Sequence, residues 1–147
     1  MTAEKPFNDE RLVSLAQEAA TRAYVPYSRF RVGAAVLLDD GRIITGCNVE
    51  NAAYGSTICA ERTAITQAVA TRPSPGEDPW ERPHIRAVAI VGGSANPCYP
   101  CGSCRQVLNE FGCERVILTN GTSSYSIPFS DLLPHSFGPE ALATTKE

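Results

Sequence analysis

The chain has 147 residues, of which 43% are apolar and 20% are charged, and its formal net charge is −3. This length and composition predict a single folded domain over residues 1–147, large enough to bury a core, and they exclude a disordered chain. Because non-specific nucleic-acid binding depends on Lys and Arg that neutralise phosphates, the net charge argues against a polynucleotide partner and favours a small uncharged ligand.

The sequence also bears on the compartment. No apolar run approaches the length of a membrane span, and the polar stretch from Met1 to Glu10 lacks the apolar region of a signal peptide. Six cysteines in such a chain are more typical of metal ligands and buried thiols than of disulfides, since reducing compartments keep thiols free. We therefore expect a cytoplasmic protein with no membrane partner.

The chain is expected to begin with an amphipathic helix and a β-hairpin. Apolar residues recur near the helical period over residues 9–24, and the helix should stop at Val25-Pro26 because the residue before a proline disfavours helical angles. Residues 32–38 form an apolar run, followed by Asp39-Asp40-Gly41 and a β-rich run over residues 42–47. An Asp-Gly turn between two such runs predicts an antiparallel hairpin.

Helices and strands then alternate. The pattern predicts a helix over residues 59–70, a strand over 87–91, a helix over 101–110 and a strand over 115–118. This alternation predicts an α/β fold in which parallel strand pairs are covered by helices on both faces, and only the hairpin pair is antiparallel.

Prolines interrupt the pattern in two places. Residues 72–84 contain four prolines and predict a surface loop. In the tail after Leu133, Pro134 and Pro139 disfavour a long final helix.

Thiols and one carboxylate gather at the starts of two predicted helices. Cys59 opens the first helix with Glu61 two residues later, and Cys101 and Cys104 form a C-x-x-C pair at the start of the second. Helix N-termini favour thiolate over thiol, and positions three apart on a helix are neighbours. Three thiolates can hold a zinc ion and leave one coordination position open for water, as in a catalytic site. Glu61 is placed to move that water's protons.

Other interpretations of the cysteines stay open. A C-x-x-C pair alone is also typical of redox sites, although the remote Cys-x-Glu favours zinc. Cys98 precedes Cys101 by three residues, so four thiols could instead close a structural zinc site. We favour Cys101 with Cys104, because Pro100 suits helix entry and leaves Cys98 in the preceding loop. The remaining thiols are expected in the core or at strand ends: Cys47 and Cys113.

Five motifs resemble those of the small homotetrameric cytidine deaminases that have three cysteine zinc ligands. In chain order they are Tyr27-Ser28-Arg29-Phe30-Arg31-Val32-Gly33-Ala34-Ala35, Gly46-Cys47-Asn48-Val49-Glu50-Asn51, Cys59-Ala60-Glu61-Arg62-Thr63-Ala64, Pro100-Cys101-Gly102-Ser103-Cys104-Arg105-Gln106 and Leu132-Leu133-Pro134-His135-Ser136-Phe137. The resemblance extends from about Ala23 to Phe137. It implies a three-layer α/β/α sandwich with a mixed five-stranded sheet. The chain departs from the family in its longer loop over residues 72–84 and in Cys98 beside the metal motif.

The resemblance implies a set of catalytic residues. One zinc ion per subunit would be held by Cys59, Cys101 and Cys104 and would activate a water that attacks C4 of the pyrimidine. Glu61 would carry the protons to N3 and to the departing ammonia. The arginine matching Arg62 would hydrogen-bond the ligand sulfurs and reduce their donation to the metal, where a surface salt bridge is the alternative interpretation.

The family also implies which residues hold a nucleoside. Asn48 and Glu50 alternate along an extended segment, so both can face one ligand, and in the family they bind the ribose 3′-hydroxyl. Phe30 would pack against the pyrimidine ring. The other implied contacts are the backbone of Ala60 and, from neighbouring subunits, Ala52, Tyr54 and Phe137. Without the resemblance, Asn48 and Glu50 would be interpreted as a polar loop end and Phe30 as a core aromatic. The tail that contains Phe137 could equally pack within one chain.

Three functions are therefore considered. The leading hypothesis is zinc-dependent hydrolytic deamination of cytidine and 2′-deoxycytidine to uridine and 2′-deoxyuridine plus ammonia, in pyrimidine salvage. The second is a related zinc deaminase acting on an aminonucleoside antibiotic or a polynucleotide base, against which the Asn48/Glu50 pair and the net charge argue. The third is a non-enzymatic zinc module closed by Cys98, in which Glu61 would have no purpose. The sequence does not rank ribose against deoxyribose.

Overall fold

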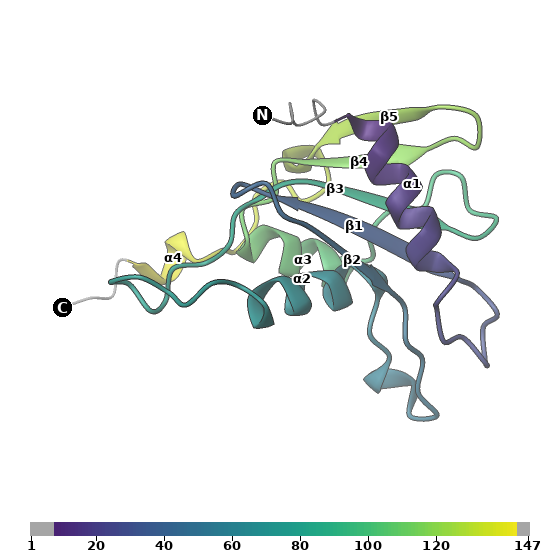
Figure 1. The fold of residues 1–147 in the computed structure, drawn as a ribbon, viewed down its shortest axis with the longest axis horizontal. Helices are drawn as coiled ribbons and strands as arrows, with labels where there is room; N and C mark the ends of the chain where they lie inside the picture. Colours follow the sequence, from purple (N-terminus) through teal and green to yellow (C-terminus); the bar gives the residue numbers. More distant parts are fainter. Residues whose placement is uncertain (1–7, 144–147) are drawn as a thin grey trace, which may run out of the picture.

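A five-stranded sheet runs through residues 8–143, the part of the chain described by the computed structural model (Figure 1). The strands are β1 (Val32–Leu38), β2 (Ile43–Cys47), β3 (Ile85–Gly92), β4 (Arg115–Thr119) and β5 (Ser124–Pro128). The helices are α1 (Asp9–Ala20), α2 (Ala60–Ala70), α3 (Gly102–Glu110) and α4 (Glu140–Ala143), and short 3-10 turns lie at η1 (Tyr54–Ser56) and η2 (Phe129–Asp131). Residues 1–7 and 144–147 lie outside this description, so the single domain over residues 1–147 stays a prediction.

The strand directions differ from the prediction. The sheet order is β2-β1-β3-β4-β5, and only β3 and β4 pair in parallel. β1 pairs antiparallel with both β2 and β3, and β4 pairs antiparallel with β5. The expectation that only the hairpin is antiparallel was therefore wrong. The crossover through α2 does connect two strands of the same direction, β2 and β3, but β1 is inserted between them and runs the opposite way.

The fifth strand, β5, was not predicted from the residue pattern, although the family resemblance implied five strands. Its residues, Ser-Tyr-Ser-Ile-Pro, are exposed or only partly buried at the edge of the sheet. Edge strands need no continuous apolar run, so the usual period-2 signal is weak there.

Helix α1 ends at Ala20, earlier than the predicted residue 24. The following residues instead become extended, because Tyr24 pairs with the segment after β2: its N–H donates to the Asn48 carbonyl (3.1 Å) and its carbonyl accepts from the Glu50 N–H (2.8 Å). The other predicted helices and strands are confirmed to within about two residues at each end.

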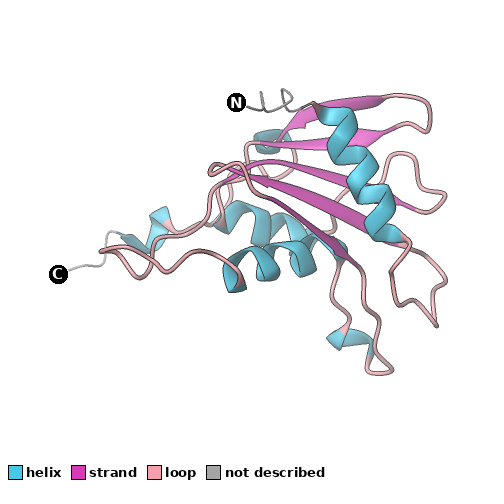
Figure 2. Ribbon diagram, in the orientation of Figure 1, coloured by secondary structure: helices cyan, strands magenta, loops and turns pink. Residues whose placement is uncertain are grey.

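The two faces of β1 build two separate cores. Alternate residues, Ala34, Val36 and Leu38, pack toward α2 and α3, whereas Ala35 and Leu37 pack toward α1. Figure 2 shows α1 on one side of the sheet and α2 with α3 on the other. The predicted three-layer α/β/α sandwich is confirmed.

Two glycines let the helices approach the sheet closely. A Cβ atom at Gly33 would lie 1.9 Å from the Ala16 carbonyl oxygen of α1, and one at Gly46 would lie 2.5 Å from the Ala60 carbonyl oxygen of α2. No side chain fits at either position. Gly46 therefore brings the first turn of α2, which carries Glu61, directly onto the end of β2.

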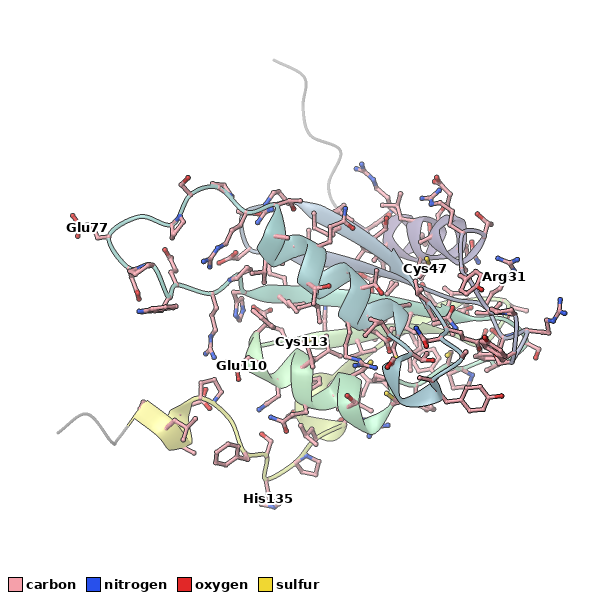
Figure 3. All side chains as sticks on the ribbon, turned by 90° about the horizontal axis from the view of Figure 1, so that it is seen from below. Arg31, Cys47, Glu77, Glu110, Cys113 and His135 are labelled. Atoms are coloured by element: carbon pink, nitrogen blue, oxygen red, sulfur yellow. The ribbon has the colours of Figure 1, made fainter. Side chains whose placement is uncertain are left out.

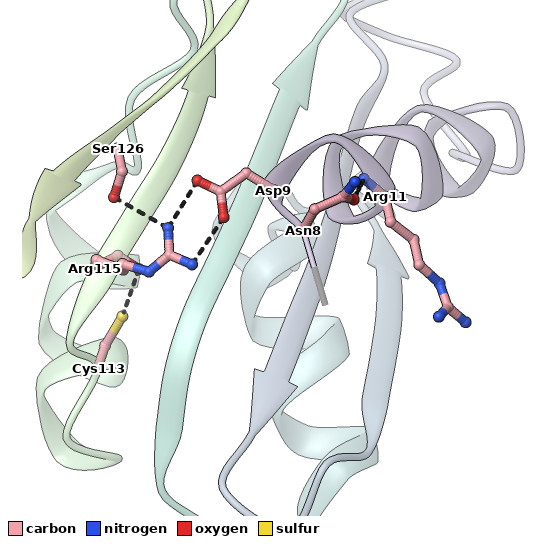
Figure 4. A network of polar contacts seen from close by, with 6 residues as sticks. All are labelled: Asn8, Asp9, Arg11, Cys113, Arg115 and Ser126. Carbon is pink, nitrogen blue, oxygen red and sulfur yellow. Dashed lines mark hydrogen bonds and ion pairs between the residues drawn. The ribbon is translucent and has the colours of Figure 1, made fainter. Parts of the chain in front are cut away.

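Polar contacts attach α1 to the far edge of the sheet (Figure 4). The Asn8 side chain caps the helix by accepting from the Arg11 N–H at 2.9 Å. Arg115 of β4 donates to both carboxylate oxygens of Asp9 at 2.8 and 2.9 Å, and also to the Ser126 hydroxyl of β5. The bidentate geometry fixes the register of α1 against β4 and β5.

The predicted irregular segments are confirmed. Residues 72–84 contain neither helix nor strand, and Figure 3 shows this loop projecting away from the sheet with Glu77 near its tip. Within the described part of the tail after Leu133, the only helix is the four-residue α4. No helix among residues 8–143 combines the length and apolar character needed to cross a membrane.

Candidate metal centre and active site

The starts of α2 and α3 bring three thiols together. Cys59 and Cys101 are the N-cap residues of these two helices, and neither side chain makes a capping hydrogen bond. Cys104 lies in the first turn of α3 and is fully buried. The three Sγ atoms all lie within 4.8 Å of one another. Cys59, Cys101 and Cys104 thus converge as the sequence predicted.

The geometry of this cluster fits a zinc ion. Sulfur ligands about 2.3 Å from a tetrahedral zinc lie about 3.8 Å from each other, and the Cys59 and Cys101 sulfurs are 3.7 Å apart. Among the described residues this is the only group of three or more Cys, His, Asp or Glu side chains with ligand atoms gathered in this way. Three protein ligands leave a fourth position for water.

The thiols influence one another's ionisation. A hydrogen bond from Cys104, with further contacts from Arg62 and Cys101, lowers the pKa of Cys59 to about 5. The same hydrogen bond and burial raise the pKa of Cys104. The shared hydrogen bond therefore favours a thiolate at Cys59 and a thiol at Cys104. A divalent cation bound at the cluster would favour the thiolate form of its ligands.

Arg62 contacts the sulfur cluster. Its Nη2 lies 3.6 Å from the Cys59 sulfur and donates to the Thr57 carbonyl at 3.2 Å. Its Nε atom is buried and has no hydrogen-bond partner among residues 8–143. An unsatisfied buried donor beside thiols fits a ligand set that is fully deprotonated when metal is bound. The guanidinium contacts a ligand sulfur, as expected from the resemblance.

Glu61 lies in the first turn of α2, two residues after Cys59. It is 3% exposed and is the one buried polar or charged side chain in the described part of the chain. Burial raises the pKa of its carboxyl above the ordinary value. Hydrogen bonds with its own backbone and with Cys104 oppose this rise. A buried carboxyl with a raised pKa that contacts a thiol cluster is typical of a group that exchanges protons with a ligand.

Cys98 does not join the cluster. It is partly buried at the end of β3, where a Cβ atom at Gly92 would come within 2.3 Å of its sulfur. Burial raises the pKa of Cys98 to about 11. Its position outside the three converging sulfurs argues against a structural site with four sulfur ligands. The other two cysteines lie as expected, Cys47 at the end of β2 and Cys113 buried.

Replacing Cys98 with alanine is therefore expected to leave about one zinc ion per chain, because three ligands remain at the cluster. Zinc content measured by atomic emission on the purified variant, beside the wild type, tests this. Loss of zinc from Cys98→Ala would show that Cys98 is a ligand and would favour a closed structural site.

The predicted ribose-binding pair lies beside the segment that carries Phe30. The Asn48 amide accepts from the Val32 N–H at 2.8 Å and donates to the Phe30 carbonyl at 2.9 Å. The Glu50 carboxylate accepts from the N–H groups of Tyr27 and Ser28. A hydrogen bond from Ser28 lowers the pKa of Glu50, which keeps it ionised. Sequence reasoning missed these bracing contacts, which join residues about 20 positions apart.

The remaining predicted contacts lie in different surroundings. Ala60 is buried at the start of α2. Ala52 and Tyr54 are exposed on the loop between β2 and α2, and the Tyr54 ring packs on Tyr27 with centroids 5.5 Å apart. Together with Ser28, Glu50 and Thr57, these two tyrosines line an open cavity of about 270 Å³. The Phe137 side chain is 63% exposed.

Three convergent thiols, an arginine against one of their sulfurs and a buried carboxylate in the first turn of α2 define a zinc-dependent hydrolase site on an α/β/α fold. A family model described as the cytidine and deoxycytidylate deaminase zinc-binding region matches residues 6–120. The chain belongs to this deaminase family.

Individual relatives match this chain over most of their length. The chain is 43% identical to a cytidine deaminase of Mycobacterium tuberculosis over 127 residues, which cover 86% of this chain and 87% of the relative. It is 43% identical to a cytidine deaminase of Sporosarcina psychrophila over 141 residues, or 94% and 97% of the two chains. A crystal structure of cytidine deaminase from Burkholderia pseudomallei superposes with a TM-score of 0.77 at 43% identity, over 89% of this chain and all of that one.

Proposed function

We infer that this chain catalyses the zinc-dependent hydrolytic deamination of cytidine and 2′-deoxycytidine to uridine and 2′-deoxyuridine, with release of ammonia. The observation that carries this inference is the cluster of Cys59, Cys101 and Cys104 with Glu61 buried beside it. The relatives named cytidine deaminase, which share 43% identity over most of the chain, support the choice of substrate.

The proton transfers are assigned to Glu61. A zinc ion at the thiol cluster would supply the electrophilic centre that makes water acidic near neutral pH. The Glu61 carboxylate accepts a proton from the water that adds to C4 of the pyrimidine and passes it to N3. The same carboxylate then takes the proton of the new C4 hydroxyl and gives it to the exocyclic amino group. The C4–N bond breaks, ammonia leaves and the C4 carbonyl of uridine forms. Burial of Glu61 keeps bulk water from competing for these protons.

The nucleoside is assigned to the residues that the family resemblance implies. Asn48 and Glu50 would hold the ribose 3′-hydroxyl, Phe30 would contact the pyrimidine ring and the Ala60 backbone would contact the base. The Asn48 amide keeps one N–H beyond the bond it donates to Phe30, and the Glu50 carboxylate has lone pairs beyond those used by Tyr27 and Ser28. The Asn48 N–H can therefore donate to a sugar hydroxyl, and the Glu50 carboxylate can accept from one, without breaking the bonds that brace them.

Arg62 is assigned to the thiol ligands themselves. Three thiolates over-compensate the charge of Zn²⁺ and weaken it as an electrophile. A guanidinium that donates to the Cys59 sulfur withdraws some of that charge.

We further propose a cytoplasmic homotetramer with shared active sites, acting in pyrimidine salvage. Tyr54 and Phe137 are 73% and 63% exposed, and Ala52 is exposed beside Tyr54. Large apolar side chains in such positions are typical of interfaces between copies of a chain. All six cysteines are free, which suits a reducing compartment.

Turnover of a small substrate panel tests this proposal. Cytidine and 2′-deoxycytidine are expected to be deaminated, and free cytosine to react at least about 100-fold more slowly in kcat/KM, because it lacks the sugar that Asn48 and Glu50 would hold. A short single-stranded DNA containing cytosine is the control. Faster reaction of the oligonucleotide than of the nucleosides would overturn the assignment and favour a polynucleotide deaminase.

A further inference from the structure

The segment leading to Phe137 is held against α3 by side chains of that helix. The Phe137 carbonyl oxygen accepts from the amide of Gln106 at 3.0 Å and from the amide of Asn109 at 3.1 Å. The Ser136 hydroxyl donates to the side-chain oxygen of Asn109 at 3.1 Å. Figure 3 shows the stretch that contains His135 running alongside α3. One backbone carbonyl thus receives two side-chain donors.

A third residue of the helix anchors the beginning of the same segment. Arg105 donates to the Leu132 carbonyl at 2.7 Å and to the Pro100 carbonyl at 2.9 Å. Between these anchors, His135 has a φ of 52°, in the left-handed region. A non-glycine residue persists there when its surroundings determine the backbone. The segment therefore has one defined path, although no regular secondary structure holds it between residues 132 and 138.

The anchoring fixes a residue whose own side chain is not packed. Phe137 is 63% exposed, so its ring adds little to the core of this chain. Gln106 and Asn109 donate to the Phe137 carbonyl and the Ser136 hydroxyl donates to Asn109, so these bonds hold the backbone of Phe137 and leave its ring free. A rigid backbone beneath an exposed aromatic ring lowers the entropy lost when that ring contacts a ligand.

We propose that Gln106 and Asn109 are positioning residues that fix Phe137 for stacking on the pyrimidine bound by a neighbouring copy of the chain. This inference rests on the proposed function. It also gives α3 two roles, because its first turn carries Cys101 and Cys104 while its later turns anchor the segment that reaches the next site.

Two substitutions remove the donors with little change of shape. Asn109→Asp keeps the oxygen that bonds Ser136 but loses the N–H donated to Phe137, and Gln106→Met removes the other donor from an exposed position. Each is expected to raise KM for cytidine by roughly three- to tenfold, with kcat changed less than about twofold, because stacking on the bound base is lost in substrate and transition state alike. Glu110→Gln, on the same helix, is the control.

A double-mutant cycle separates positioning from a general structural effect. Phe137→Ala is expected to raise KM by roughly tenfold or more. If the amides act through the Phe137 ring, adding Asn109→Asp or Gln106→Met to Phe137→Ala changes KM by less than about twofold. The proposal would be overturned if the increases in KM of the single variants multiplied in the double variants. It would also be overturned if the single variants had an unchanged KM and a lowered Tm.

Hydrogen exchange of the peptide covering residues 132–138 gives a readout that needs no turnover. Asn109→Asp and Gln106→Met are expected to speed exchange in this peptide relative to wild type and to Glu110→Gln, and unchanged exchange would overturn the anchoring. If the wild type exchanges as expected but does not deaminate cytidine, the proposed function fails and the anchoring stands. The exposed Gln106 position makes Gln106→Met the variant to use if Asn109→Asp does not fold.

Discussion

The Cys101→Ala variant is expected to contain less than about a tenth of the zinc of the wild type and to have no measurable cytidine turnover. The substitution leaves two thiols of a cluster whose three sulfurs all lie within 4.8 Å. Cys98 is not placed to replace the lost ligand, because its sulfur lies against Gly92 and outside the converging group. Removing one ligand from a three-ligand catalytic site removes most of the binding free energy of the metal.

Zinc content and the loss of cytidine absorbance are measured on the same preparations. Cys47→Ala is the control, since Cys47 is a free thiol like Cys101 but lies at the end of β2 outside the cluster. It should keep both zinc and turnover. A full zinc complement in Cys101→Ala would show that the ligand set has been assigned incorrectly.

The second large effect is expected from Glu61→Gln. This variant should keep one zinc ion per chain, because Glu61 is not one of the three converging ligands. Its kcat should fall by about 10³-fold or more, because general acid–base catalysis by a positioned side chain contributes roughly 10²–10⁴-fold and here one carboxyl performs every proton transfer. Glutamine fills the same buried space but cannot accept and return a proton.

Glu10→Gln, an exposed carboxylate on α1, serves as the control for Glu61→Gln and should be fully active. Single-turnover measurements at saturating cytidine separate the chemical step from binding. Turnover of Glu61→Gln within about tenfold of the wild type would remove Glu61 from the catalytic role, whatever the zinc content.

The residues at the metal cluster could be predicted because their signals are local. A cysteine at a helix start, a C-x-x-C pair and a glutamate two residues from a ligand can each be recognised within a few positions of sequence. The structure brings Cys59, Cys101 and Cys104 together at two helix N-termini and buries Glu61 beside them. The contact of Arg62 was implied by the family resemblance alone, and it is made to the sulfur of Cys59, three residues earlier.

Strand pairing was less predictable because it depends on partners far apart in the chain. The alternation of helices and strands correctly indicated a parallel pair, β3 with β4, but nothing local indicates that β1 lies between β2 and β3. The early end of α1 has a similar cause, because the pairing of Tyr24 with Asn48 and Glu50 overrides a helical pattern. Strand β5 lacked an apolar run altogether.

The hydrogen bonds that hold the candidate binding residues could not be predicted from the sequence either. Asn48 bonds the backbone of Val32 and Phe30, and the carbonyl of Phe137 is held by Gln106 and Asn109 about 30 residues earlier. The motif resemblance indicated candidate binding residues but not the hydrogen bonds that position them. Their geometry depends on tertiary packing, which only coordinates reveal.

The most direct test is the ultraviolet absorbance of cytidine incubated with purified wild-type protein, with zinc quantified on the same sample. Rapid loss of the cytidine signal at one zinc ion per chain, absent from Glu61→Gln, is the expected result. A protein that holds one zinc ion per chain and leaves cytidine and 2′-deoxycytidine unchanged would contradict the assignment of a nucleoside deaminase.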